Sequence, residues 1–169
     1  MNRRDALKAA LFASVGGGIL AACRTRRASS SRVLSDEDQV LAEEIADTLL
    51  PTTAGSPGAK AAGTGVSMSL ILSDCYKPAD QRAFSEGLER FRAECRSERG
   101  KNFLELARAD RETFVRSVGR QAWFEPVRDL ALGAYFSSET GMTKALRYVR
   151  VPGKYVGCMP LEPGQPAWG

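Results

Sequence analysis

Apolar residues recur at helical spacing along most of this chain, from residue 35 to residue 137, and no stretch alternates apolar and polar residues over enough positions for a sheet. An apolar residue at every third or fourth position forms one stripe on a helix, whereas a half-buried strand needs a period of two. The chain has 169 residues, a length that suits one domain. We therefore predict an all-α fold, with five or six helices in a small single domain over residues 35–140.

Capping residues and prolines set the expected ends of these helices. Ser35 followed by three acidic residues is typical of a helix start, and Pro51 ends that helix. Residues 51–65 are rich in Pro, Gly, Thr and Ala and are predicted to form a loop. A helix over 66–76 is apolar all round, so we expect it to be buried on most sides. Later helices are predicted from Pro78 to Gly100, from residue 101 or 102, from Asp110, and over 123–137.

The first 22 residues are organised like a targeting signal. A basic start is followed by an apolar run over 9–22 that is shorter than the roughly 20 residues needed to span a bilayer. Three consecutive glycines argue against a buried core helix here. Residues 1–22 are therefore interpreted as a signal peptide. Arg3 and Arg4 resemble a twin-arginine export signal, although the residues around them depart from that pattern and Sec export is an alternative.

The end of this apolar run resembles a bacterial lipobox, with the sequence Leu-Ala-Ala before Cys23. We expect Cys23 to be lipidated, which would anchor the chain stably in a membrane because two or three acyl chains suffice for that. Residues 23–34 are then a flexible, Ser- and Arg-rich tether, and a plain linker is the simpler interpretation. The predicted location is the periplasmic side of the bacterial cell envelope.

Three further cysteines are Cys75, Cys95 and Cys158. An exported protein meets an oxidising compartment, so disulfides are allowed. An odd number indicates one pair plus one thiol, or a bond to another molecule. Cys75 and Cys95 lie near the ends of two adjacent predicted helices and could form a disulfide, while Cys158 in the irregular tail could bond to a partner subunit. Three free, buried thiols are the alternative.

The chain contains no histidine. This excludes a Ser-His-Asp triad, histidine-ligated zinc and a covalent c-type haem site, and makes an independent enzyme improbable. Carboxylate clusters at residues 36–38 and at Glu43, Glu44 and Asp47 are expected on the exposed side of a helix start, where acids interact favourably with the helix dipole. We therefore predict no catalytic, cofactor-binding or metal-binding residues in this chain.

The net charge of +4 is located at the N-terminus. Residues 33–169 hold 17 basic and 19 acidic side chains. A DNA-binding domain would concentrate positive charge on the folded part, so nucleic-acid binding is not expected.

Residues 141–169 differ from the helical part. They contain four of the eight prolines and five glycines, which forbid a helix after about residue 150. They also contain Tyr148, Tyr155 and Trp168, whereas disordered tails are poor in aromatic residues. We predict an extended C-terminal arm that docks on a partner, or that wraps the core of its own domain.

Three blocks of this sequence, in order and at similar spacing, resemble the gluconate 2-dehydrogenase subunit 3 family. The second block is the stretch 135–143, and the third comprises Tyr148 and 151–160. The residues of the first block are Ile45, Thr48, Leu49, Leu50, Pro51, Thr52, Thr53, Pro57, Gly58 and Ala59. The resemblance covers residues 35–169.

The resemblance implies a small, non-catalytic subunit of a membrane-associated dehydrogenase for sugars or sugar acids. Its large partner would be an FAD flavoprotein of the glucose-methanol-choline type, and a multihaem cytochrome c subunit could accept the electrons. The small subunit would aid export, stability and assembly of the flavoprotein. Buried aromatic residues dominate such interfaces. The expected interface residues are Tyr135, Phe136, Tyr148, Tyr155 and Trp168.

Two other functions are compatible with the sequence. One is a stand-alone envelope lipoprotein that binds a ligand or an envelope partner. The other is an enzyme that uses Cys158 or a carboxylate pair. A neighbouring reading frame for a large FAD oxidoreductase would favour the accessory subunit over both.

Overall fold

The computed structural model describes residues 32–151, 153–154, 157–160 and 162–168. These residues form helices joined by loops, and their only extended pairings are two isolated bridges. The prediction of an all-α fold is confirmed. The helices are α2 (Asp36–Leu49), α3 (Thr64–Cys75), α4 (Pro78–Arg99), η1 (Phe103–Glu105), α5 (Arg108–Val118), η2 (Ala122–Phe124), α6 (Glu125–Phe136) and η3 (Gly141–Ala145).

Most helix ends lie where the sequence predicts them. The Ser35 hydroxyl accepts a hydrogen bond from the Asp38 backbone N–H at 3.0 Å and caps α2. Gly100 ends α4 in the left-handed conformation (φ 68°) that glycine adopts most readily. The start of α5 differs, because its N-cap is Ala107 and Asp110 lies inside the first turn. An acidic residue interacts favourably with the helix dipole at either position.

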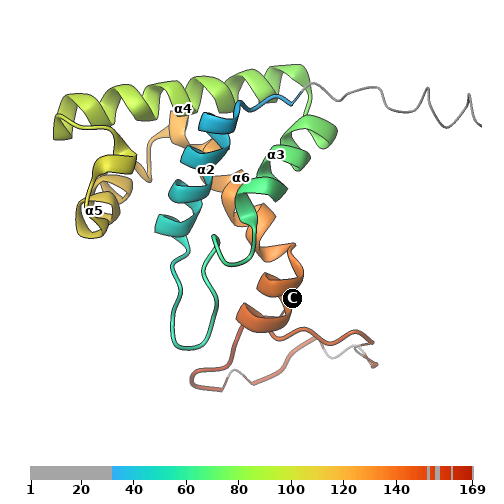
Figure 1. Ribbon diagram of the computed structural model, residues 1–169. Helices are drawn as coiled ribbons and strands as arrows, with labels where there is room; N and C mark the ends of the chain where they lie inside the picture. Colours follow the sequence, from blue (N-terminus) through green and yellow to red (C-terminus); the bar gives the residue numbers. More distant parts are fainter. Residues whose placement is uncertain (1–31, 152, 155–156, 161, 169) are drawn as a thin grey trace, which may run out of the picture. The chain divides into compact units, whose positions relative to one another are not determined.

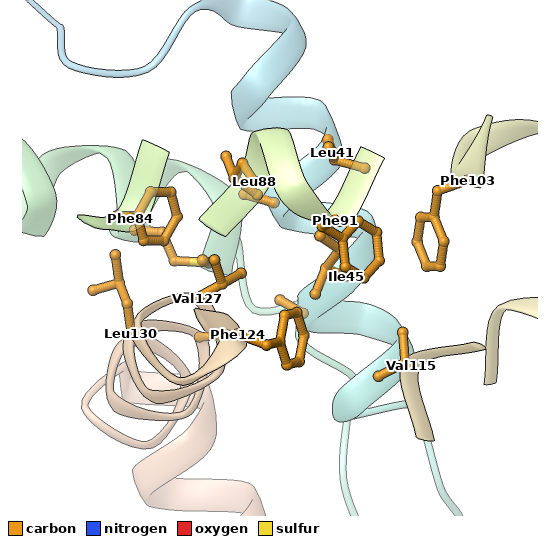
Figure 2. Packing of buried hydrophobic residues seen from close by; sticks show 14 of the residues in the cluster. Leu41, Ile45, Phe84, Leu88, Phe91, Phe103, Val115, Phe124, Val127 and Leu130 are labelled. Carbon is orange, nitrogen blue, oxygen red and sulfur yellow. The ribbon is translucent and has the colours of Figure 1, made fainter. Parts of the chain in front are cut away.

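Three helices, α2, α3 and α6, pack against one another, while α4 packs on α6 and α5 packs on α2 (Figure 1). The aromatic centre of the core is Phe91 of α4. Its ring lies edge-on to Phe103 at a centroid distance of 4.9 Å and stacks on Phe124 at 5.5 Å (Figure 2). Such pairs add about 0.5–1.5 kcal/mol each beyond their buried area. Phe91 therefore joins α4 to both 3₁₀ turns.

Helix α3 is buried on one side only, in contrast to the prediction. Met68 and Leu72 are fully buried, but Val66 is 52% exposed and Leu70 57% exposed. Both exposed residues lie one helical turn apart on the face that no described element covers. Within the described residues, no helix is long and apolar enough to cross a bilayer.

The N-terminal boundary of the domain lies before the predicted one. Leu34 is 3% exposed and belongs to the core, and Val33 packs against it. The Val33 N–H donates to the Ser73 hydroxyl of α3 at 3.4 Å. Val33 and Leu34, the last two residues of the predicted tether over 23–34, therefore belong to the domain, because burial of apolar side chains is favourable.

Candidate partner-binding surface

Tyr135, in the last turn of α6, joins this helix to the loop between α2 and α3. Its hydroxyl donates a hydrogen bond to the Pro57 carbonyl oxygen at 2.6 Å and lies 2.7 Å from Ser56 Oγ. A phenol has one proton, so the Ser56 hydroxyl donates to the phenol oxygen. The Tyr135 side chain thus holds two consecutive residues of the loop.

This position corrects the prediction that Tyr135 contacts a partner. The residue is 2% exposed, and the neighbouring Phe136 ring packs edge-on against it at 5.0 Å. Tyr135 thus lies in the interior of its own domain, and Phe136 packs partly buried against the same core.

The loop is held at its other end by residues of the first sequence block. The Gly58 N–H donates to Thr52 Oγ1 at 2.9 Å, and the Lys60 N–H donates to Asp47 Oδ1 at 3.0 Å. A Cβ atom on Gly58 would lie 2.7 Å from the Thr52 nitrogen, so the chain can approach this closely only at glycine. These motif residues shape the loop from within.

Two carboxylates of α2, Asp38 and Glu44, are half-buried and paired, whereas Asp36 and Glu37 are exposed as the sequence suggests. Glu44 forms ion pairs with Arg111 of α5 and, at 2.9 Å, with Lys60. The hydrogen bond to Glu44 and its charge raise the pKa of Lys60. Asp38 pairs with Arg92 of α4. These carboxylates therefore connect α2 to the elements around it.

The pKa of Asp38 reflects two opposing effects. Partial burial raises it, but hydrogen bonds from Arg92 and Ser35, together with the Arg92 charge, lower it by more. The net result lies below the ordinary value of 3.8. Asp38 therefore favours its ionised form in the folded state.

The three cysteines in the described part of the chain are free. Cys75 is exposed at the end of α3, whereas Cys95 is buried in α4. The 17 residues from Pro78 to Cys95 correspond to roughly 25 Å of helix at 1.5 Å per residue, and a disulfide needs Cα atoms within about 7 Å. This corrects the predicted Cys75–Cys95 disulfide. Burial also raises the pKa of the Cys95 thiol, which makes it less reactive.

The first residues of the predicted arm are not extended. Residues Gly141–Ala145 form a single π-helical turn that packs on α6. A Cβ atom on Gly141 would lie 2.0 Å from the Tyr135 carbonyl oxygen, so this turn requires glycine. We use "the arm" below for residues 147–168, which follow this turn.

The end of the arm contacts its beginning. The Arg147 N–H donates to the Ala167 carbonyl oxygen at 2.7 Å, and the Arg147 guanidinium lies 4.2 Å from the centre of the Trp168 ring. A cation over an indole face is attracted to it by about 0.5–1 kcal/mol at an exposed site. We call this contact between Arg147 and Trp168 the clasp, and it closes the arm into a loop.

Large apolar side chains of the arm are exposed. Val151 is 79% exposed, and the others lie between 41% and 55%. They are Tyr148, Val149, Val151, Met159 and Trp168. Apolar side chains that are exposed in one segment are candidates for an interaction site.

Tyr148 and Trp168 are thus available for a partner, while Tyr155 lies outside the described residues. Cys158 is exposed in the same segment. Aromatic residues alone, on which the predicted interface is based, do not indicate Arg147, Val149 and Val151 as exposed residues of this segment. A run of β-branched residues beside prolines is the signal that could have found the two valines.

A groove of about 500 Å³ lies between the start of α2, the end of α4 and η1. Val40 and Leu104 at this groove are half-exposed. Its polar side chains largely pair with one another: Arg96 donates to Asn102 at 2.8 Å, and hydrogen bonds from Asn102 lower the pKa of Glu105. Among the described residues, no group of three or more metal-ligating side chains is close enough to hold an ion.

The predicted export and lipidation residues, Arg3, Arg4 and Cys23, lie outside the described residues. Comparison with known proteins gives one match. The model of the family described as gluconate 2-dehydrogenase subunit 3 matches residues 36–153, which is more than two thirds of the chain. No curated protein and no solved structure matches significantly.

Proposed function

Because this chain belongs to the gluconate 2-dehydrogenase subunit 3 family, we propose that it is the non-catalytic small subunit of a membrane-associated FAD-dependent dehydrogenase for a sugar or sugar acid. Membership of the family implies a dehydrogenase complex as the partner. In this proposal FAD belongs to a large flavoprotein subunit of the glucose-methanol-choline type. A multihaem cytochrome c is a further candidate subunit. The small subunit carries no cofactor and aids export, stability and assembly.

The observation that supports the proposal best is the exposed apolar surface of the arm. The arm exposes five large apolar side chains outside the core of the helical domain. Aromatic and apolar side chains that become buried on binding supply most of the affinity of protein interfaces. An arm of this kind supports a role in binding another subunit.

Export and anchoring complete the proposal. Residues 1–22 would direct export, and a twin-arginine route would allow the flavoprotein to travel folded with FAD bound. Lipid on Cys23 would then hold the complex at the periplasmic face of a membrane. Cys158 is exposed in the arm and would bond to a cysteine of the flavoprotein in that oxidising compartment. A non-reducing gel of the complex tests this bond directly.

The experiment is co-expression of the full chain with a large FAD oxidoreductase of the glucose-methanol-choline type from the same genome, followed by affinity purification. A chain that ends after Leu146 keeps the π-helical turn, whose Leu146 N–H donates to the Gly141 carbonyl oxygen. We expect this shortened chain to keep its helical circular dichroism spectrum and to lose the flavoprotein.

A matched control replaces exposed apolar residues elsewhere. Val66→Ser with Leu70→Ser removes two side chains from the open face of α3, which are about as exposed as those of the arm. This variant should retain the flavoprotein. Retention of the flavoprotein by the shortened chain, at unchanged affinity, would show that the arm is not the interface.

A further inference from the structure

The arm, taken together with the π-helical turn before it that carries Lys144, has a charge opposite to that of the helical domain. Residues 141–169 contain four basic side chains (Lys144, Arg147, Arg150 and Lys154) and one acidic side chain, Glu162. Residues 33–140 contain 13 basic and 18 acidic side chains. The charge of this chain is therefore separated between a basic arm and an acidic body.

The basic side chains of the arm are not neutralised by the acidic body. Every ion pair between described residues joins side chains between Arg32 and Asp129. Arg147 lies over the Trp168 ring, an interaction that leaves its positive charge in place. Lys144, Arg150 and Lys154 are exposed. These three cations are thus available beside the exposed apolar side chains.

We infer that the arm binds an acidic, partly apolar surface of the flavoprotein subunit. Carboxylates of that surface would pair with Lys144, Arg150 and Lys154, and an apolar pocket would receive Val149 and Val151. Complementary charge of this kind accelerates association and selects the partner. The inference rests on the proposed function, because it describes the partner surface in the same complex.

An anionic membrane could also attract a segment that is rich in basic and aromatic residues. The backbone of the arm argues against it. Among the described residues from 148 to 160, no N–H or C=O group forms a backbone hydrogen bond with another described residue. Such groups are costly to bury in lipid, which offers no partners, whereas a protein groove can supply them to an extended segment. The observations therefore favour a protein surface.

The test compares two variants of equal net charge in the full chain. The first replaces the free cations of the arm and of the turn before it (Lys144→Gln, Arg150→Gln and Lys154→Gln). The matched control replaces three arginines that are exposed on the helical body and form no ion pair with a described residue. They are changed as Arg82→Gln, Arg116→Gln and Arg120→Gln.

The dissociation constant for the purified flavoprotein is measured at about 50 mM and about 500 mM NaCl. At low salt we expect the arm variant to bind about tenfold more weakly, since three exposed ion pairs are lost. The control should bind like the unaltered chain. The affinities of the three proteins should converge at high salt, where the charges are screened.

Three results would overturn the inference or its premise. Equal affinity of the arm variant and the unaltered chain at low salt would show that the cations do not contact the flavoprotein. Equal weakening of both variants would show that only net charge matters. If the unaltered chain does not bind the flavoprotein at all, the proposed function itself is refuted.

The membrane alternative is tested with vesicles that contain phosphatidylglycerol, on a Cys23→Ser background that lacks the predicted lipid site. Loss of vesicle binding by the arm variant, with unchanged affinity for the flavoprotein, would assign the arm to the membrane instead. Equal vesicle binding by both variants, together with the tenfold loss for the flavoprotein, supports the inference.

Discussion

Replacement of Tyr135 by phenylalanine should destabilise the domain and leave its partner affinity unchanged. The substitution removes only the hydroxyl, which donates to the Pro57 carbonyl oxygen at 2.6 Å and lies 2.7 Å from Ser56 Oγ. The ring stays in place because it is 2% exposed. The prediction therefore separates a structural role from the role at an interface that the sequence suggests.

The magnitude follows from the two hydrogen bonds. Ser56 can still donate to the Pro57 carbonyl oxygen at 3.3 Å, so the main loss is the strong bond to this oxygen. Loss of a hydrogen bond that leaves a partly buried carbonyl oxygen without a strong donor costs about 1–2 kcal/mol. For a domain of this size the melting temperature should fall by roughly 3–7 °C.

Urea unfolding of the purified full chain, monitored by circular dichroism, measures the change, and Tyr148→Phe is the control. Tyr148 is 47% exposed, so loss of its hydroxyl should alter the free energy of unfolding by less than about 0.5 kcal/mol. In a double-mutant cycle, the effects of Ser56→Ala and Tyr135→Phe should not add, because the two hydroxyls share one hydrogen bond and the same Pro57 carbonyl oxygen. An unchanged free energy of unfolding for Tyr135→Phe, with weaker binding to the flavoprotein, would refute the assignment.

The remaining predictions concern other positions of the domain. Because the folded state lowers the pKa of Asp38, the ionised carboxylate stabilises the fold above pH 3.8, and this contribution is lost as the pH falls through the folded-state pKa. The difference in the free energy of unfolding between the native chain and Asp38→Asn should therefore shrink in acid unfolding titrations. Gly141→Ala should destabilise by roughly 1–3 kcal/mol in urea unfolding, since its Cβ meets a backbone carbonyl; Gly133→Ala, whose Cβ meets nothing, should instead stabilise α6 by up to about 1 kcal/mol. Trp168→Ala should open the clasp, and trypsin should then cleave the arm several-fold faster, as followed by mass spectrometry. Maleimide should label the exposed thiols of Cys75 and Cys158 in the reduced native protein, and the Cys95 thiol only after unfolding. Labelling of Cys95 in the native protein would contradict its burial.

Local signals in the sequence are sufficient to predict the α-helices, but not the π-helical turn over Gly141–Ala145. Ser35, Pro51, Pro78 and Gly100 act within one helical turn of their own positions, and each lies at or beside an observed helix end. The apolar stripe of α6 likewise predicts its buried face. Such signals depend on backbone geometry and capping, which need no knowledge of the rest of the fold.

The side-chain partners could not be predicted in the same way. An inward-facing Tyr135 and an outward-facing one have the same helical spacing, and only the position of the loop decides between them. The arginines that pair with Asp38 and Glu44 lie 54 and 67 residues further along the chain, and no local pattern marks them. The distance between Cys75 and Cys95, in contrast, follows from the length of the predicted helix alone and was available from the sequence.

The long sequence separation of these contacts determines when the domain can become rigid. Helix α2 receives its ion pairs from residues 92 and 111, and the loop that follows it is held by a residue 79 positions after Ser56. A ribosome makes the chain from the N-terminus, so α2 emerges long before any of these partners. Helix α3, which packs on α2, is synthesised directly after it. The ion pairs of α2 and the support of its loop by Tyr135, in contrast, form only once nearly the whole helical domain has been synthesised.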